Sequence, residues 1–113
     1  DLVRSRGLGD VYKRQRDIAA ARAGWEKAKA LILDERIRLV LLDEINIALR
    51  YGYLDADEVV AFLLTQKPAM THVVLTGRNA PPGLIEAADL VSEIAAVKHP
   101  FKEGIKAQKG VEF

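Results

Sequence analysis

The hydrophobic pattern of the chain is organised around residues 37–44, an apolar run that stops on two carboxylates, Asp43 and Glu44. Apolar runs without alternation are typical of strands in parallel sheets that helices cover on both faces. Residues 71–76 repeat this pattern and also end on a polar turn, and residues 89–97 form a third, weaker segment. The pattern therefore predicts three parallel strands.

A helix is predicted from Arg16 onward, because apolar residues recur there at spacings of three and four. These residues are Ile18, Ala21, Trp25, Ala28 and Ile32. A place on this stripe favours a core role for Trp25 over a role as a stacking platform for a base or a corrin ring.

Capping signals predict three shorter helices between and after the strands. Residues 45–51 precede Gly52, which can end a helix. Asp55 and Glu58 have the spacing of a capping box and open the next helix. Pro82 can occupy the first position of another helix. The order of helices and strands predicts part of a three-layer α/β sandwich with a parallel sheet.

The composition indicates one small globular domain. The 113 residues include 17 basic and 16 acidic side chains, a net charge of +1 that favours neither nucleic acid nor a membrane surface as partner. The absence of cysteine excludes disulfides and thiolate chemistry and fits a reducing compartment such as the cytoplasm. No run approaches the roughly 18 consecutive apolar residues of a membrane span, and no secretory signal is visible.

Residues 1–15 differ from the rest of the sequence. They lack a starting Met, carry four basic residues against two acidic ones, and show neither a strand nor a helix period. No buried strand precedes Gly7-Leu8-Gly9 and no Gly-Lys-Ser/Thr follows, so a phosphate-binding loop has no support there. We expect a foreign or disordered tail, similar to translated adaptor sequence, and a single domain over residues 16–113.

Polar residues follow both central strands, where a chemical site is expected. An apolar strand that ends on Asp43 and Glu44 has the form of a Walker-B element, and Mg²⁺ prefers such hard oxygen ligands. Acids after strands are also common as helix caps or solvated turn residues, and the pattern alone leaves both interpretations open. Thr76, Gly77 and Arg78 add a hydroxyl, a glycine that permits close approach and a guanidinium suited to phosphate, at the edge shared with Asp43.

The end of the sequence gives weaker signals. His99 has no second His or Cys at metal-ligand spacing, which favours a structural or solvent-exposed role over zinc ligation. Four lysines form a basic tail that fits a solvated face better than a phosphate site: Lys98, Lys102, Lys106 and Lys109.

Together these segments resemble one family, the ATP:corrinoid adenosyltransferases of the cob(I)yrinic acid a,c-diamide type. The resemblance covers residues 16–113 and corresponds to the C-terminal half of that family. It is carried by Leu-Val-Leu-Leu-Asp-Glu-Ile-Asn at 39–46, Tyr-Leu at 53–54, Val-Val-Leu-Thr-Gly-Arg at 73–78, Ala-Asp-Leu-Val-Ser-Glu at 88–93, Val-Lys-His-Pro-Phe at 97–101 and Gly-Ile-Lys-Ala-Gln-Lys-Gly-Val-Glu-Phe at 104–113.

The resemblance implies a RecA-like P-loop NTPase fold, a homodimer, and ATP with Mg²⁺ acting on a corrinoid in adenosylcobalamin biosynthesis or salvage. In the family, Co(I) of the reduced corrinoid attacks the 5′ carbon of ATP and triphosphate leaves; a flavodoxin-type reductant is a further implied partner. No catalytic nucleophile is required of the protein. By the same resemblance Asp43 and Glu44 would be the metal ligands, and Asn46, Thr76 and Arg78 would face the nucleotide. Lys98, His99 and Phe101 lie in a family motif without an assigned role.

The sequence lacks two further motifs of that family, the glycine-rich phosphate loop and an aromatic Gly-Phe-Thr-Trp segment associated with the corrinoid. We therefore expect an N-terminally truncated enzyme that does not transfer adenosyl groups by itself. Two alternatives remain open at this stage. One is another RecA-like ATPase that releases diphosphate or phosphate, and the other is a non-catalytic interaction module.

Overall fold

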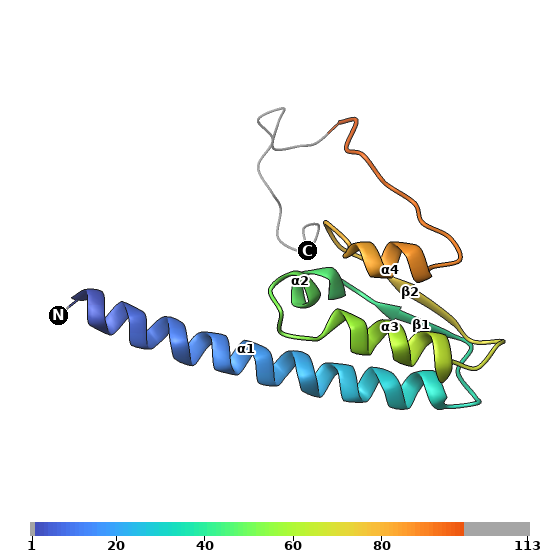
Figure 1. Cartoon of the computed structure of the whole chain (residues 1–113), viewed down its shortest axis with the longest axis horizontal. Helices are drawn as coiled ribbons and strands as arrows, with labels where there is room; N and C mark the ends of the chain where they lie inside the picture. The colour runs from blue at the N-terminus through green and yellow to red at the C-terminus, as the bar shows by residue number, and fades with distance from the viewer. Residues whose placement is uncertain (1, 99–113) are drawn as a thin grey trace.

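The computed structural model describes the backbone of residues 2–98 and the side chains of residues 9–98 (Figure 1). The elements follow the order α1 (Leu2–Leu33), β1 (Leu39–Leu42), α2 (Ile45–Arg50), α3 (Ala56–Thr65), β2 (His72–Leu75) and α4 (Pro82–Ala87). This alternation is that of an α/β protein, as the sequence predicts.

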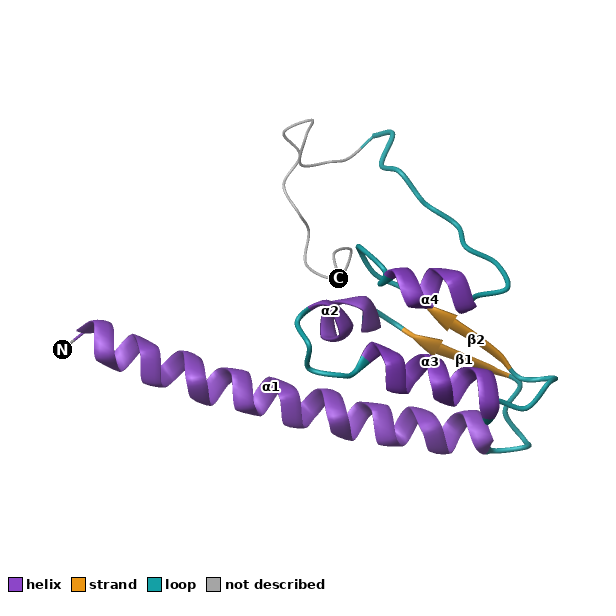
Figure 2. Cartoon of the chain, viewed as in Figure 1, coloured by secondary structure: helices purple, strands orange, loops and turns teal. Residues whose placement is uncertain are grey.

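The two strands form a parallel pair, with Leu39 opposite His72 and Leu42 opposite Leu75. Figure 2 shows both arrows pointing the same way, so the strands end at one common edge. The loop after β1 and the loop after β2 therefore start side by side. This register is what brings the polar residues of the two strand ends together.

The core lies between the helices and the face of the sheet that carries Val40. Its buried residues are Trp25, Ala28, Ile32, Val40, Leu49, Leu54, Val59, Phe62 and Leu84. Trp25 of α1 meets Phe62 of α3 edge-on, with ring centroids 5.4 Å apart and an interplanar angle of 81°. Helix α4 packs against α3 on the same side. The core therefore holds α1, α3 and α4 on one face of the sheet.

Helix α1 confirms the predicted apolar stripe and begins earlier than expected. Trp25, Ala28 and Ile32 are buried, so the core role of Trp25 is confirmed. The helix begins at Leu2, whereas the sequence predicted no helical period before Arg16. The amino-terminal half projects beyond the rest of the molecule (Figure 1), with exposed side chains from Gly9 to Arg16. A helix already fixed by packing near Trp25 can extend residue by residue, because propagation costs far less than nucleation.

No helix in residues 2–98 is long and apolar enough to cross a membrane.

The short helices follow their capping signals. The carboxylate of Asp55 accepts a hydrogen bond of 2.9 Å from the Asp57 N–H and caps α3. Gly52 has φ +72° just after α2, a left-handed conformation that suits glycine at a helix end. Pro82 opens α4 as expected. These local signals depend on one or two residues each, which explains why the sequence alone located the helices.

The expectation of strands covered on both faces is wrong for the described residues. Leu39 and Leu41 point away from the core and are 62% and 59% exposed, and Val74, opposite Leu41 on β2, is 44% exposed. We call these three residues the outer face. Within residues 2–98 the sheet has helices on one side, so the described part forms two layers instead of three.

The predicted third strand is also absent: residues 88–98 have no regular secondary structure. Figure 1 shows this segment leaving α4 as a loop. Its apolar residues are exposed, with Ile94 at 93% and Leu90, Val91 and Val97 likewise in solvent. A strand needs a neighbour for its backbone hydrogen bonds, and no third strand is present in the described chain.

Candidate functional site

The two strand ends meet at a hydrogen bond between side chains. The Thr76 hydroxyl, immediately after β2, donates to Oδ1 of Asp43, immediately after β1, over 2.9 Å. The residues are 33 positions apart in sequence, and the Leu42–Leu75 register places them next to each other. The predicted shared edge of Asp43 and Thr76 is therefore confirmed.

Thr76 joins the two loops with both its backbone and its side chain. Its N–H donates to the Leu42 carbonyl over 3.2 Å, and its own carbonyl accepts from the Asn46 N–H over 3.4 Å. Its hydroxyl oxygen accepts from the Glu44 N–H over 2.9 Å while donating to Asp43. One hydroxyl thus fixes the orientation of the Asp43 carboxylate and the start of the Glu44 turn.

Glu44 occupies a strained backbone position. Its φ of 63° and ψ of 20° are left-handed, and its side chain makes no capping hydrogen bond to α2, which it precedes. For a residue other than glycine this conformation costs about 1 kcal/mol. The carboxylate is exposed. Strain at a strand end that also carries an uncommitted carboxylate is typical of functional sites.

Asn46 and Gly77 are packed against each other beneath this turn. Asn46 is 3% exposed, and its side-chain oxygen Oδ1 is buried without a hydrogen-bond partner among the described residues. Gly77 has φ +135°, and a Cβ at this position would lie 2.8 Å from the Asn46 Cβ. The glycine is thus required by contact with Asn46. A buried amide oxygen without a partner costs free energy, so its retention needs an explanation.

Arg78 and Asn79 complete the second loop. Both are exposed, and Arg78 forms no ion pair within the described part of the chain. Asn79 has φ 55°, a second left-handed residue in this small region. A guanidinium free of carboxylate partners, beside a polar strand end, is suited to bind phosphate oxygens.

The carboxylates at this edge are of the donor type that Mg²⁺ prefers. Mg²⁺ binds through one or two carboxylates and completes its shell with water and phosphate oxygens. Asp43 and Glu44 are adjacent, exposed carboxylates, and the hydroxyl of Thr76 already holds one of them. Within residues 2–98 no group of three or more His, Asp or Glu side chains could enclose a metal.

Hydrogen bonds join four of the five predicted site residues, Asp43, Glu44, Asn46 and Thr76, and Arg78 follows in the same loop as Thr76, with its side chain exposed. Their ligand roles stay predictions. The sequence did not predict the contact between Asn46 and Gly77, because this contact is tertiary. The only signal was the glycine itself, which permits a close approach. The interpretations of His99, Phe101 and the lysines beyond Lys98 lie outside the described residues.

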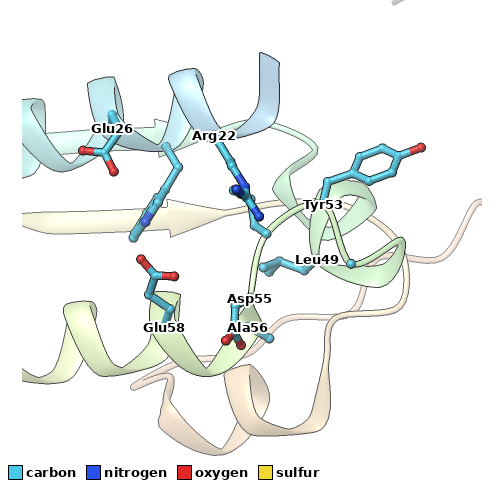
Figure 3. A pocket seen from close by; sticks show the side chains of 10 residues that line it. Arg22, Glu26, Leu49, Tyr53, Asp55, Ala56 and Glu58 are labelled. Carbon is cyan, nitrogen blue, oxygen red and sulfur yellow. The ribbon is translucent and has the colours of Figure 1, made fainter. Parts of the chain in front are cut away.

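A cavity of about 640 Å³ lies away from these strand-end residues, between α1, the loop before α3, and α3 itself. Figure 3 shows Arg22 from α1 and Glu58 from α3 reaching into the space between the two helices. Trp25 also lines it, and its indole Nε1 is buried without a partner in the described chain. None of the five strand-end residues lines this cavity, so it gives no support to the predicted nucleotide site.

The fold and the strand-end cluster define an α/β protein with acidic and basic side chains at the carboxyl edge of a parallel sheet. Residues 7–113 match the family model of the ATP:corrinoid adenosyltransferases BtuR/CobO/CobP. The chain belongs to this family. The match begins inside residues 1–15, whose foreign origin stays a prediction.

Curated relatives agree with this assignment. The chain is 68% identical over 104 residues to a corrinoid adenosyltransferase of Sinorhizobium sp, which covers 92% of this chain and 49% of that protein. A corrinoid adenosyltransferase of Pseudomonas aeruginosa is 61% identical over 104 residues, 92% of this chain and 51% of its own length. One from Escherichia coli K12 is 40% identical over the same share of this chain and 53% of its own length. The chain therefore spans about half the length of these relatives.

Proposed function

We propose that the chain supplies the carboxylate side of the Mg²⁺–ATP site of a corrinoid adenosyltransferase with a RecA-like P-loop fold. The single observation that carries this proposal is the Thr76–Asp43 hydrogen bond, which fixes a carboxylate at the strand edge. Family membership supplies the substrates, ATP and a corrinoid. The complete enzyme would join the 5′ carbon of ATP to Co(I) of the corrinoid and release triphosphate.

Each residue of the cluster has a distinct task in this proposal. Asp43, oriented by Thr76, and Glu44 would hold the metal, which neutralises charge on the triphosphate when bound. Arg78 would bind a phosphate oxygen of the leaving group. Asn46 would use its unpartnered oxygen Oδ1 to accept a hydrogen bond when the site is filled. The cobalt supplies the electron pair, so these residues bind and orient without acting as nucleophiles.

The 113-residue chain alone is proposed to be inactive. Its sequence holds no glycine-rich loop to cradle the phosphates, and the exposed cluster cannot by itself exclude water from ATP. A homodimer and a flavodoxin-type reductant belong to the proposal for the complete enzyme. Both are carried by the resemblance to the family.

A fusion protein, which we call the joined protein, tests the proposal. The half of the Sinorhizobium enzyme that this chain does not match is fused ahead of residues 16–113, and adenosylcobalamin formation from ATP and chemically reduced cobalamin is followed by absorbance. We expect turnover with triphosphate as the product, and no turnover by the 113-residue chain.

Two matched variants of the joined protein test whether Glu44 is a metal ligand. Glu44→Gln should lower the rate by about a hundredfold, because it weakens binding of the metal that neutralises the charge of the triphosphate. Glu35→Gln is the control, since Glu35 is exposed in the turn before β1, at the other end of the strand. Equal rates in both variants would reject Glu44 as a ligand. Diphosphate or phosphate as the product would instead indicate an ATPase.

A further inference from the structure

The cavity between α1 and α3 is lined by charged side chains that have no role in the proposed function. Its volume is about 640 Å³, and its walls come from α1, the end of α2, the following loop and α3, all within the region that matches the family. Figure 3 shows Arg22 on one wall and Glu58 on the opposite wall. Neither side chain forms an ion pair within residues 9–98. The cavity therefore holds one cation and one anion that are available to a ligand.

The other polar groups of the cavity differ in how far they are already satisfied. Glu26 is paired with Lys29 over 2.7 Å, and the Asp55 carboxylate caps α3 through the Asp57 N–H. Trp25 is 5% exposed, and its indole Nε1 is a buried donor without an acceptor in the described chain. A buried donor without a partner costs free energy. Because Trp25 borders the cavity, an acceptor placed there would remove this cost.

These groups define the chemical class of the ligand. Arg22 and the indole N–H of Trp25 are donors, and the carboxylate of Glu58 is an acceptor. A primary carboxamide has a carbonyl oxygen that accepts and an NH₂ group that donates, and it carries no charge. A carboxylate in the same place would be attracted by Arg22 and repelled by Glu58, and it would bring no donor for Glu58. The cavity is thus suited to a carboxamide in preference to a carboxylate.

The cavity lies at the same end of the sheet as the strand-end residues. Helices α1 and α3 run opposite to the strands (Figure 2), so α3 begins at the carboxyl edge. At about 1.5 Å per residue, Arg22 lies about 16 Å back along α1 from Leu33, whereas β1 is only about 13 Å long. Helix α2 starts next to Glu44, and its residue Leu49 lines the cavity. The predicted metal site and the cavity therefore lie at the two ends of α2, which is about 9 Å long.

We propose that this cavity binds a carboxamide side arm of the corrinoid substrate, and that Glu58 sets a preference for amidated corrinoids. The rim of a corrin carries side arms that end in either carboxylates or carboxamides. Cobalt must approach the 5′ carbon of ATP to about 3.5 Å, so the ring lies beside the nucleotide and its side arms extend outward past α2. Arg22 and Trp25 donate to the carbonyl oxygen of the side arm, and Glu58 accepts from its NH₂ group.

This inference rests on the proposed function, because it takes a corrinoid as the substrate. It does not require Asp43 or Glu44 to bind the metal. The cavity and the strand-end residues share no side chain, so substitutions can test the two sites separately.

Binding measured without catalysis tests the preference. The joined protein is dialysed without ATP against two unreduced corrinoids, cobinamide with amidated side arms and cobyrinic acid with free carboxylates, and bound corrinoid is measured by absorbance. We expect the unaltered joined protein to bind cobinamide more tightly. In Glu58→Gln the ratio of the two dissociation constants should fall at least about tenfold, because the charge that repels a carboxylate is gone while an acceptor for an amide remains.

Matched variants control for general effects of charge. Asp57→Asn should leave the ratio unchanged, since Asp57 is an exposed carboxylate one residue away in α3 that does not line the cavity. Arg22→Met should weaken cobinamide binding at least about tenfold, because the carbonyl oxygen loses a charged donor. Lys27→Met should not weaken it, because Lys27 is exposed on α1 outside the cavity.

The possible results separate this inference from the proposed function. Equal ratios in Glu58→Gln and Asp57→Asn, with cobinamide still bound, would overturn the inference alone. An ion pair that only joins the helices would give that result, together with lower stability of Glu58→Gln and Arg22→Met in urea. Weaker binding of ATP, and not of cobinamide, in Arg22→Met would also overturn it. A joined protein that binds neither corrinoid would contradict the proposed function itself and this inference with it.

Discussion

Particular charged and polar groups at the two ends of the sheet differ in whether they have partners. At the amino end, in the turn before β1, the Arg36 guanidinium donates two hydrogen bonds to Asp34, of 3.1 and 2.8 Å. Beside it, before β2, the Lys67 ammonium donates to the carbonyls of Pro68 and Thr71. At the carboxyl end Arg78 has no ion pair within residues 2–98, and Asn46 Oδ1 has no partner there.

Backbone conformation also differs between the two ends of the sheet. Glu44, Gly77 and Asn79 have positive φ, and all three lie in the loops at the carboxyl end. The turn before β1 contains no residue of this kind. Strain and unsatisfied groups lower stability, so a fold retains them where they serve binding. We therefore expect the amino end to contribute stability and the carboxyl end to bind a ligand, and substitutions at either end test this division.

The largest effect on stability is expected at Gly77. Gly77→Ala places a Cβ 2.8 Å from the Asn46 Cβ and forces alanine into φ +135°, and we expect a loss of about 2 kcal/mol in the free energy of unfolding. Urea denaturation of the 113-residue chain measures it. Gly83→Ala in α4 is the control, because its Cβ meets nothing within 4 Å and alanine favours a helix. If both variants lost the same stability, the close contact with Asn46 would be irrelevant.

The next effect is expected at Thr76. Thr76→Val keeps the size of the side chain but removes the hydroxyl that donates to Asp43 and accepts from the Glu44 N–H. We expect a loss of about 1 kcal/mol on unfolding, with a larger fall in the activity of the joined protein, because the carboxylate loses its orientation. Thr76→Ser retains the hydroxyl and should restore both. A Thr76→Val protein with full activity would separate Thr76 from the site.

A substitution at Glu44 should raise the stability of the chain instead of lowering it. Glu44→Gly relieves the left-handed strain and should raise the stability of the chain by up to about 1 kcal/mol, while it removes the proposed metal ligand and lowers activity. Urea denaturation and the rate of the joined protein measure the two quantities. Glu44→Gln keeps the strain and should lower activity alone. Loss of stability in Glu44→Gly would show that its side chain supports the fold.

Features that depend on local spacing or strand direction could be predicted from the sequence, whereas features that depend on contacts with other segments could not. The stripe around Trp25 and the cap at Asp55 follow from spacing within one helix, and both were predicted. The neighbourhood of Asp43 and Thr76 followed from strand direction. Coverage of Leu41 and pairing of residues 89–97 depend on other polypeptide segments, so the local pattern predicted them wrongly for the described chain. The strain at Glu44 had no signal, since the sequence has no glycine there.

The smallest effect is expected at the amino end. The Arg36 guanidinium, and then the Arg36 N–H, hold the pKa of Asp34 below its ordinary value of 3.8. Because this pKa is lowered in the folded state, the pair stabilises the fold above pH 3.8, and this contribution is lost as the pH falls through the lower native pKa. Arg36 is almost fully exposed, so water and salt screen the pair and its contribution is small.

Asp34→Asn should therefore remove a small part of the acid-side fall in stability and leave the activity of the joined protein unchanged. Thermal unfolding between pH 2 and 7, the range over which a carboxyl titrates, compares it with Glu35→Gln, a neighbouring carboxylate without an ion pair in the described chain. In 1 M salt the difference between the variants should shrink, because the Debye length falls to about 3 Å. A loss of activity in Asp34→Asn as large as that in Glu44→Gln would contradict the division of roles between the two ends of the sheet. Asp34 is paired with a cation, whereas the partner of Asp43 is the neutral Thr76 hydroxyl, and this difference separates the two carboxylates on either side of one short strand.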